Sequence, residues 1–527
     1  MNRLLRTLSL VILFSSITSC TVNPVTGQQQ FSLISPDQEV VIGAQQYQSA
    51  QQSQGGQYYM DPELQTYLDE VGQKLARVSD RPQLPYEFVV LNSSVPNAWA
   101  LPGGKIAVNR GLLFHLEDEA QLAAVLSHEI VHAAARHSAT QMTRGMLAGI
   151  GLQVLDTATG GSPLGGLAAQ VGTSAWMSRY GREAELESDA YGMEYMARAG
   201  YDPYGAVVLQ EKFVELSKDR QQDFLAGLFA SHPPSQGRVN ANVAKAKTLP
   251  PGGLRNREIF ARKVARLKRD QPAYEAQDKA MKALQDKAPK EALSLLDEAI
   301  RIQPREGQFW ELRGHAWKML GDDSKAIEAY SAAISRNPDF FSHHLARGIQ
   351  YFQQGKSNSA HSDLLRSHQL LPTPIASLYL GDIAAARGER QTAITYYQEA
   401  ANAPGDIGQQ ARTRLAELQL SEAPSKYIRS SLALGAGGML QLSVQNQSAT
   451  AVDGVVVQIS EAIATLFNGP ASFVEVPVTL RAGQQITLST HIGPLDGSAL
   501  RRYRAVVVKA APVAPKTPLV APKTQAS

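Results

Sequence analysis

The segment His128-Glu129-Ile130-Val131-His132 contains the residue types that metal-dependent hydrolysis requires. The two histidines are four residues apart, and side chains at that spacing share one face of an α-helix. Both imidazoles can therefore bind one Zn²⁺ at about 2.0–2.1 Å. Glu129 then lies beside the metal, where it can take a proton from zinc-bound water and deliver it to a leaving amine. The preceding residues, 119–126, are helix-forming with one apolar face, so we expect the motif on a helix.

A catalytic zinc also needs a third protein ligand and an open position for water. The run Glu185-Leu186-Glu187-Ser188-Asp189 lies on a second predicted helix, with its first and last carboxylates on one face. One carboxylate can bind zinc, and another can accept a hydrogen bond from a zinc-bound imidazole. An acidic cluster on a helix is usually a solvated face. Beside the histidine motif, however, this cluster is a good candidate for the rest of the site.

Four motifs, in this order along the chain, resemble the peptidase M48 family. They are Asn97–Gly104, the His128–His132 helix, the Glu185–Asp189 helix, and Ser231-His232-Pro233-Pro234-Ser235 with Arg238. The family includes HtpX-like and Oma-like membrane proteases and BepA-like periplasmic proteases. The BepA-like group couples a gluzincin domain to tetratricopeptide repeats, and the architecture of this chain resembles that group most closely.

The resemblance implies a role for each residue that matches a motif of the family. It makes His128, His132 and Glu185 the ligands of one Zn²⁺ per chain, and Glu129 the general base and acid. Asp189 becomes the hydrogen-bond partner of a zinc ligand. Glu185 is chosen over Glu187 because the ligand in the family lies four residues before the aspartate.

His232 and Arg238 approach the metal in the family. They either stabilise the tetrahedral oxyanion, or His232 occupies the open zinc position and keeps the enzyme latent. A lone His-Pro-Pro sequence is more often a helix boundary than a catalytic element. His137 follows His132 by five residues, an awkward spacing for the same metal, so we expect it to be structural.

The resemblance also implies that residues 97–104 form an edge strand along the cleft. An extended substrate could add to this edge through main-chain hydrogen bonds. The expected substrate-binding residues are Asn97, Ala98, Trp99 and Ala100. Core packing is an equally weighted alternative for Trp99.

The elements around these motifs predict a multidomain protein. Residues 20–250 alternate helical patterns with strand patterns at 86–91 and 97–108, which predicts an α+β domain of the gluzincin type. Residues 272–420 repeat with a period of 34, as in Pro304, Pro338 and Pro372. This period is typical of tetratricopeptide repeats, an α-solenoid whose concave groove binds peptides.

The C-terminal part of the chain has a different pattern. Residues 426–509 alternate apolar and polar side chains between Gly, Asn and Ser, which predicts a small β-sandwich-like domain. Residues 510–527 are rich in Pro, Ala, Lys and Val, and we expect a disordered tail.

The first 19 residues are typical of a signal peptide. Arg3 and Arg6 precede a short apolar run, residues 8–14, and small residues lead to Cys20, the only cysteine of the chain. This segment resembles a bacterial lipoprotein signal, in which the cysteine is acylated. That implies a lipid anchor on the periplasmic face of the outer membrane of a Gram-negative bacterium. Thr21 follows the cysteine where an aspartate would favour the inner membrane.

Together these features predict a zinc metalloendopeptidase. The resemblance implies that it acts on misfolded or stalled envelope proteins in outer-membrane quality control, with the repeats recruiting substrate or the outer-membrane assembly machinery. The alternative is a periplasmic chaperone or assembly adaptor with a latent protease site. A zinc-dependent cell-wall hydrolase ranks last, because no peptidoglycan-binding repeat is visible. The net charge of +3 is small for 527 residues, so no nucleic-acid partner is expected.

Overall fold

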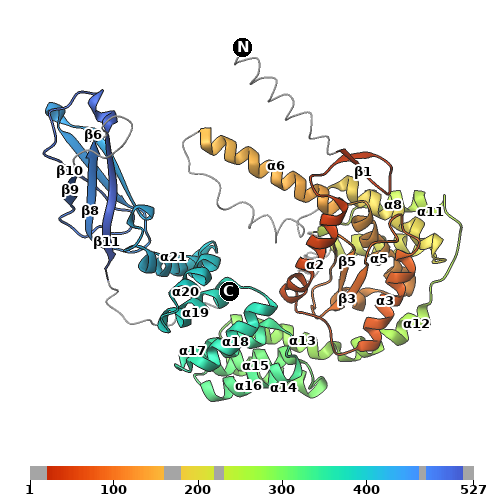
Figure 1. Cartoon of the computed structure of the whole chain (residues 1–527). Helices are drawn as coiled ribbons and strands as arrows, with labels where there is room; N and C mark the ends of the chain where they lie inside the picture. Colours follow the sequence, from red (N-terminus) through yellow and green to blue (C-terminus); the bar gives the residue numbers. More distant parts are fainter. Residues whose placement is uncertain (1–19, 159–179, 219–230, 462–470, 514–527) are drawn as a thin grey trace, which may run out of the picture. The chain divides into compact units, whose positions relative to one another are not determined.

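The computed structural model describes residues 20–158, 180–218, 231–461 and 471–513 (Figure 1). The predicted signal segment, residues 1–19, and residues 514–527 lie outside this part of the chain. The chain divides into two compact units. The first unit comprises residues 1–321 and 335–340, and the second comprises residues 322–334 and 341–527.

The first unit contains a three-stranded sheet with the order β3-β5-β4. Its strands are β3 (Glu87–Leu91), β4 (Ala98–Leu101) and β5 (Lys105–Asn109). β3 runs parallel to β5, and β4 runs antiparallel to it. Both predicted strand segments are therefore confirmed. Among the described residues β4 pairs with β5 alone, so it is an edge strand of this sheet.

The alternation of side chains along the strands divides the sheet into two buried faces. Phe88, Val90, Ala98 and Ala100 belong to the large core of the unit, which α3 (Pro62–Ala76) and α5 (Glu119–Ala134) cover. The opposite face carries a smaller cluster to which α2 (Pro36–Ser53) contributes. The members of this smaller cluster are Tyr47, Ala50, Val89, Leu91, Trp99, Leu101 and Ala107.

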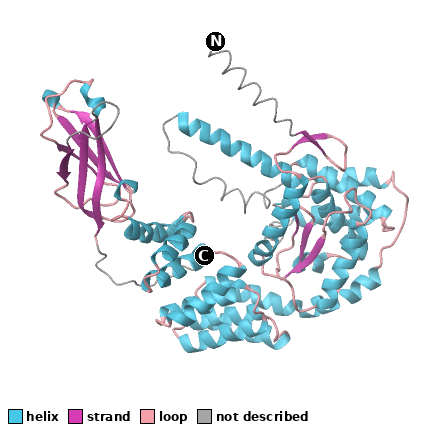
Figure 2. Ribbon diagram, viewed as in Figure 1, coloured by secondary structure: helices cyan, strands magenta, loops and turns pink. Residues whose placement is uncertain are grey.

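Further elements complete the first unit (Figures 1 and 2). The strands β1 (Cys20–Val22) and β2 (Gln29–Phe31) form an antiparallel hairpin. The helices are α4 (Arg110–His115), α6 (His137–Ala158), α8 (Arg182–Arg198), α9 (Tyr204–Lys218), α11 (Gln236–Ala246) and α12 (Arg257–Lys263). Within the described ranges, none of the helices is both long enough and apolar enough to span a bilayer.

Paired helices follow, as the 34-residue period predicts. They are α13 (Ala265–Gln285), α14 (Pro289–Ile302), α15 (Gly307–Met319), α16 (Asp323–Arg336), α17 (Phe341–Gln353), α18 (Ser357–Leu370), α19 (Pro374–Ala386), α20 (Arg390–Ala401) and α21 (Gly405–Gln419). Gly321 and Gly355 have φ angles of 80° and 72°, which explains the periodic glycine, because a left-handed turn favours this residue.

The first helices of this series share a core with the strands and helices before them. Leu267, Tyr274, Leu296 and Phe309 belong to the same buried cluster as Val90 of β3. α13 begins at Ala265, ahead of the predicted start of the repeats, and Pro272 lies within it. The boundary between the two compact units consequently falls inside the helical repeats and not before them.

The second unit ends in a small β-sandwich. The strands are β6 (Ile428–Leu434), β7 (Leu440–Asn446), β8 (Val452–Glu461), β9 (Ala471–Glu475), β10 (Gln485–Ser489) and β11 (Tyr503–Pro512). They form two antiparallel sheets, β10-β7-β6 and β11-β8-β9. Leu442 of β7 packs in one core with Val457 of β8 and Val507 of β11. The predicted multidomain fold is confirmed, although β11 extends past the predicted limit of 509.

Candidate metal centre

Helix α5 carries the first half of the site. Asp118 caps its N-terminus by accepting a hydrogen bond from the Gln121 amide at 2.9 Å, and every residue of the helix is buried. The spacing of four residues brings the Nε2 atoms of His128 and His132 to 3.0 Å from each other. The helix supplies two converging nitrogen donors, as the sequence predicts.

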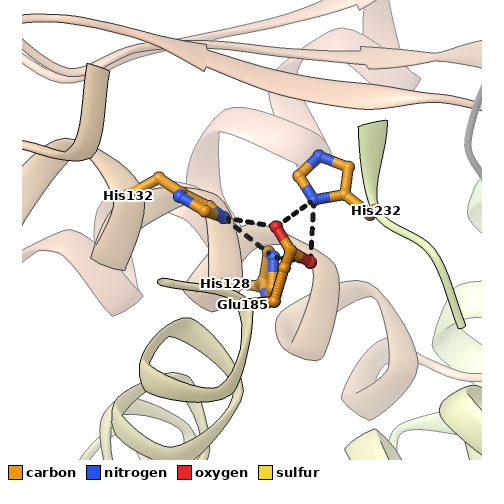
Figure 3. A group of neighbouring side chains, drawn as sticks. All are labelled: His128, His132, Glu185 and His232. Carbon is orange, nitrogen blue, oxygen red and sulfur yellow. Dashed lines mark hydrogen bonds and ion pairs between the residues drawn. The ribbon is translucent and has the colours of Figure 1, made fainter. Parts of the chain in front are cut away.

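Helix α8 brings the carboxylate. Glu185 Oε2 lies 3.6 Å from His128 Nε2, and Glu185 Oε1 lies 3.5 Å from His132 Nε2 (Figure 3). Gly192 permits this close approach of α8 to α5, because a Cβ there would lie 3.2 Å from Ser127 Oγ and 3.3 Å from His128 N. The two helices therefore set the distance between the carboxylate and the imidazoles.

The donor set fits a tetrahedral zinc ion. Bonds of about 2.0–2.1 Å place the ligand atoms of such an ion about 3.3 Å apart, close to the three separations of 3.0–3.6 Å given above. Donor atoms of His128, His132, Glu185 and His232 all lie within 4.8 Å of one another. Two imidazoles and one carboxylate are also a donor set that zinc prefers.

Asp189 contacts Nδ1 of His128, the outer nitrogen of the ring, which faces away from the proposed metal position. His128 Nδ1 lies 3.0 Å from Asp189 Oδ1, and Arg238 donates to both oxygens of Asp189 at 2.7 Å. Burial raises the pKa of Asp189, but the hydrogen bonds from Arg238 and His128 outweigh it and lower the pKa overall. The carboxylate is thus ionised and points the Nε2 lone pair of His128 towards the predicted metal position.

His232 lies on the other side of the carboxylate. Its Nδ1 is 3.1 Å and 3.2 Å from the two oxygens of Glu185 (Figure 3), and its Nε2 is 3.5 Å from Glu129 Oε1. Burial opposes the charged imidazole, but the carboxylates of Glu129 and Glu185 raise the pKa of His232 to about 9. The Arg238 Nη1 atom also approaches Glu185 Oε2, at 2.9 Å. Both residues predicted from the Ser231–Ser235 motif therefore face the site.

Glu129 lies beside the cluster of metal-binding donor atoms and is not one of its members. It is buried, and burial is the main reason that its pKa is raised. Among the described residues, its Oε2 atom has no hydrogen-bond partner. A buried carboxylate oxygen without a partner is costly, so this atom is available to a water or substrate group in the site.

The predicted substrate strand adjoins the same cavity. Ala98 of β4 lines an open hollow together with His128, Glu129 and Arg238. Asn97 Oδ1 accepts a hydrogen bond from Ser231 Oγ at 3.2 Å. Trp99 points to the opposite face of the sheet. There it packs edge-on against Tyr47, with 6.3 Å between the two ring centroids. The core-packing alternative therefore describes the side chain of Trp99.

Two neighbours of His132 were not among the predicted site residues. Tyr180 stacks on the His132 ring with a centroid separation of 3.9 Å, and no sequence motif marks it. His137, expected to be structural, lies with its Nδ1 2.9 Å from His132 Nδ1. Glu187 contacts His137 at 3.3 Å. Burial raises the pKa of Glu187, but hydrogen bonds from His137 and Asn23 lower it overall.

Comparisons with known proteins find two families in this chain. Residues 62–245 match the model of Peptidase family M48, and residues 278–339 and 345–407 match a tetratricopeptide-repeat model. The beta-barrel assembly-enhancing protease of Escherichia coli strain K12 is 25% identical over 65% of this chain and 72% of its own length. Its namesake from Yersinia pestis is 26% identical over 43% of this chain. This match spans about half the relative, 48% of its length.

A mitochondrial protein is a further relative. The metalloendopeptidase OMA1 of Schizosaccharomyces pombe is 30% identical over 41% of this chain and 63% of its own length. Residues 62–245, which match the family model, contain the histidine motif, the acidic helix and the strands beside them. This chain carries a metallopeptidase domain of Peptidase family M48, followed by tetratricopeptide repeats.

Proposed function

We propose that this chain is a zinc-dependent endopeptidase that degrades misfolded or stalled envelope proteins in outer-membrane quality control. One observation carries the proposal: His128, His132 and Glu185 converge, with the buried Glu129 carboxylate beside them, in a hollow that β4 adjoins. Such a site combines a metal, a general base and a place for an extended peptide. The names of the bacterial relatives support the substrate class, β-barrel proteins of the envelope.

The proposed chemistry divides between the metal and the side chains. Zinc supplies a Lewis acid that polarises the scissile carbonyl and acidifies water. Glu129 accepts the proton of the attacking water and passes it to the leaving amine, and its raised pKa suits this exchange. Asp189 orients His128. His232 and Arg238 direct positive charge towards the place where the oxyanion develops.

The outer-membrane location is part of the proposal. Acylation of Cys20 would tether the chain to the periplasmic face of the membrane, and the peptidase domain at 20–250 would follow the tether. The repeats at 272–420 would bind unfolded substrate or the assembly machinery. The β-rich domain at 426–509 has no assigned role in this scheme.

The proposal is tested with the mature chain in which Cys20 is replaced by serine. Degradation of an unfolded outer-membrane protein is compared between this protein and its Glu129→Gln variant at matched zinc content. We expect cleavage by the parent and loss of at least about 10²-fold in the variant, the typical contribution of general-base catalysis. Equal cleavage by both proteins would contradict the role of Glu129.

A second function, a chaperone or assembly adaptor with a latent protease, is supported by the contacts of His232. The imidazole lies against Glu185 and Glu129, where it could occupy the open position of the metal. His232→Ala should then increase proteolysis, whereas a large loss would favour the oxyanion role. An adaptor should also suppress aggregation of an unfolded outer-membrane protein equally well with Glu129→Gln.

A further inference from the structure

His132 differs from His128 in what holds its outer nitrogen. Among the described residues, the partner of His132 Nδ1 is another imidazole, His137, at 2.9 Å, and not a carboxylate. We propose that His137, Glu187 and Asn23 form a hydrogen-bonded chain that positions the metal ligand His132. This inference rests on the metal site proposed above and assigns three further positioning residues to it.

The chain of contacts is continuous. His137 Nε2 lies 3.3 Å from Glu187 Oε1, and Asn23 Nδ2 donates to the same oxygen at 2.8 Å. The His137 and Glu187 side chains are 9% and 21% exposed, compared with 0% for His132. The interactions are therefore shielded from water over most of their length, which strengthens them.

The chemistry of the donors fixes the position of each proton. His132 must offer the lone pair of Nε2 to the metal, so its proton is on Nδ1 and is donated to His137 Nδ1. His137 then carries its own proton on Nε2, which points to Glu187. The glutamate accepts from both His137 and Asn23. Each imidazole N–H in the series thus points to the next residue on the way to Glu187. No other arrangement of protons satisfies both the metal and the two imidazoles.

The end of the chain is held rigidly. Asn23 Oδ1 accepts hydrogen bonds from the amides of Val25 and Thr26 at 2.9 Å and 3.3 Å. The backbone N–H of Asn23 donates to the Gln28 carbonyl at 2.8 Å. The side-chain oxygen of Asn23 is thus occupied by the turn, so its side-chain NH₂ group is fixed towards Glu187. The turn between β1 and β2 thereby becomes part of the support of the metal site.

The arrangement links the Nδ1 atom of each proposed zinc histidine to a carboxylate, directly in one case and through His137 in the other. His128 reaches Asp189 directly, at 3.0 Å, and His132 reaches Glu187 through His137. Glu185 and Glu187 therefore have different tasks although they lie two residues apart on α8. The first faces the imidazole Nε2 atoms, and the second faces the opposite side of His132.

A purely structural role for these residues makes a different prediction from a positioning role. Loss of packing would lower the stability of the metal-free chain and leave the zinc affinity of the folded protein unchanged. Loss of positioning would weaken zinc binding of the folded protein, even where removal of a buried hydrogen bond also lowers the metal-free stability. Outer partners of this kind typically contribute about 10–100-fold to metal affinity.

The test measures zinc dissociation constants of the full mature chain by competition with a chromogenic chelator, using zinc alone as the probe. The variants are His137→Phe, which retains a ring, and Glu187→Ala. Glu183→Ala is the matched control, because this exposed glutamate lies on the same helix. Thermal unfolding of the metal-free proteins is recorded in parallel. Glu187→Gln, which keeps the shape and one acceptor, is a second variant in case Glu187→Ala does not fold.

We expect zinc affinity to fall about 10–100-fold in His137→Phe and Glu187→Ala, by less in Glu187→Gln, and not at all in Glu183→Ala. The loss of affinity should be the same at every temperature at which the metal-free variants are fully folded. Normal zinc affinity in the folded variants would overturn the positioning role. So would a loss of affinity that appears only at temperatures where the metal-free variant is partly unfolded. If the parent itself fails to bind zinc, the proposed metal site fails, and this result is distinct from the first two.

Discussion

Each ring nitrogen of His128 has a different carboxylate as its partner, and the proposed site depends on this division. Nε2 faces Glu185 at 3.6 Å, and Nδ1 meets Asp189 at 3.0 Å. Asp189 is held in turn by two hydrogen bonds from Arg238. The imidazole cannot rotate without breaking this series, so its lone pair stays directed at the metal position.

Asp189→Asn should weaken zinc binding by about 10–100-fold. The amide oxygen can still accept a hydrogen bond from His128 Nδ1, but the negative charge that pairs with Arg238 is lost. The measurement is the zinc dissociation constant of the variant. Glu194→Gln, which alters a partly exposed carboxylate on the same helix, is the control. Unchanged affinity in Asp189→Asn would show that His128 needs no charged partner.

The sequence motifs predicted the proposed metal ligands and Asp189, the partner of His128, but not the partners of His132. Two histidines four apart on one helix converge whatever surrounds them. His137 is five residues from His132, and its contact depends on the end of α5 at Ala134 and the left-handed φ of 66° at Arg136. That bend places His137 against the imidazole ring of His132. Tyr180 also reaches His132 through tertiary packing, which no local pattern encodes.

At the scale of elements, β4 directs some of its main-chain groups away from β5, along the edge of the sheet. The Asn109 amide donates to the Asn97 carbonyl at 2.9 Å, and pairing continues from Ala98 opposite Val108. Because the bonds of an antiparallel ladder alternate, Ala98 and Ala100 direct their N–H and C=O groups away from β5. These are the groups that an added peptide strand would use.

Ala100→Pro should therefore impair catalysis and leave the sheet intact. Proline removes an N–H that β5 does not use, and edge strands tolerate it. Loss of one hydrogen bond worth about 1–1.5 kcal/mol predicts a fall in kcat/KM of about tenfold for a peptide substrate. Thermal unfolding reports whether the sheet is preserved. A folded variant with normal kcat/KM would exclude strand addition at this residue.

The first repeat is joined to the sheet by buried polar groups. Glu306 is fully buried and accepts hydrogen bonds from Asn92 at 2.9 Å and Tyr274 at 3.1 Å. Asn92 also accepts from Arg110 Nε at 2.9 Å, and the Arg110 guanidinium lies 3.4 Å from the centroid of the Tyr274 ring. Arg110 follows β5 directly, so the joint supports the strands beside the site.

Glu306→Ala should lower the free energy of unfolding of the first unit by about 3 kcal/mol, because buried donors lose their acceptor near a buried cation. Urea unfolding is the measurement, and Glu298→Ala, an exposed site on α14, is the control. A loss below about 1 kcal/mol, the size of an ordinary surface change, would contradict the importance of the joint.

The period of 34 residues predicted the paired helices and the turn glycines, because each repeat must satisfy the same packing. It did not predict that the first repeat shares a core with the peptidase region. That union depends on tertiary contacts of Tyr274 and Glu306 with residues far earlier in the chain. Hydrophobic periodicity describes single elements and says little about which elements share a core.

At the scale of the whole molecule, the two compact units should respond differently to the metal. Zinc binds side chains of the first unit alone in our account, so binding should stabilise that unit by mass action. With free zinc at 100 times its dissociation constant, the gain is about 2.7 kcal/mol. The second unit contributes no ligand and should gain nothing.

Differential scanning calorimetry with and without a zinc chelator tests this expectation. Chelation should lower the midpoint of one transition and leave the transition of the second unit where it was. Repetition with Glu185→Gln should give a chain whose unfolding no longer depends on the chelator. A shift of both transitions would indicate that the metal stabilises the chain at some other place.

The most direct test of the account is the coordination of zinc in the full mature chain, measured by X-ray absorption at the zinc edge. The account predicts one zinc per chain, with two imidazoles and a carboxylate oxygen at about 2.0–2.2 Å. The same shell should persist in Glu129→Gln, because Glu129 is beside the metal and not bound to it. A shell without two imidazoles, or one that changes when only Glu129 is altered, would contradict the proposed site.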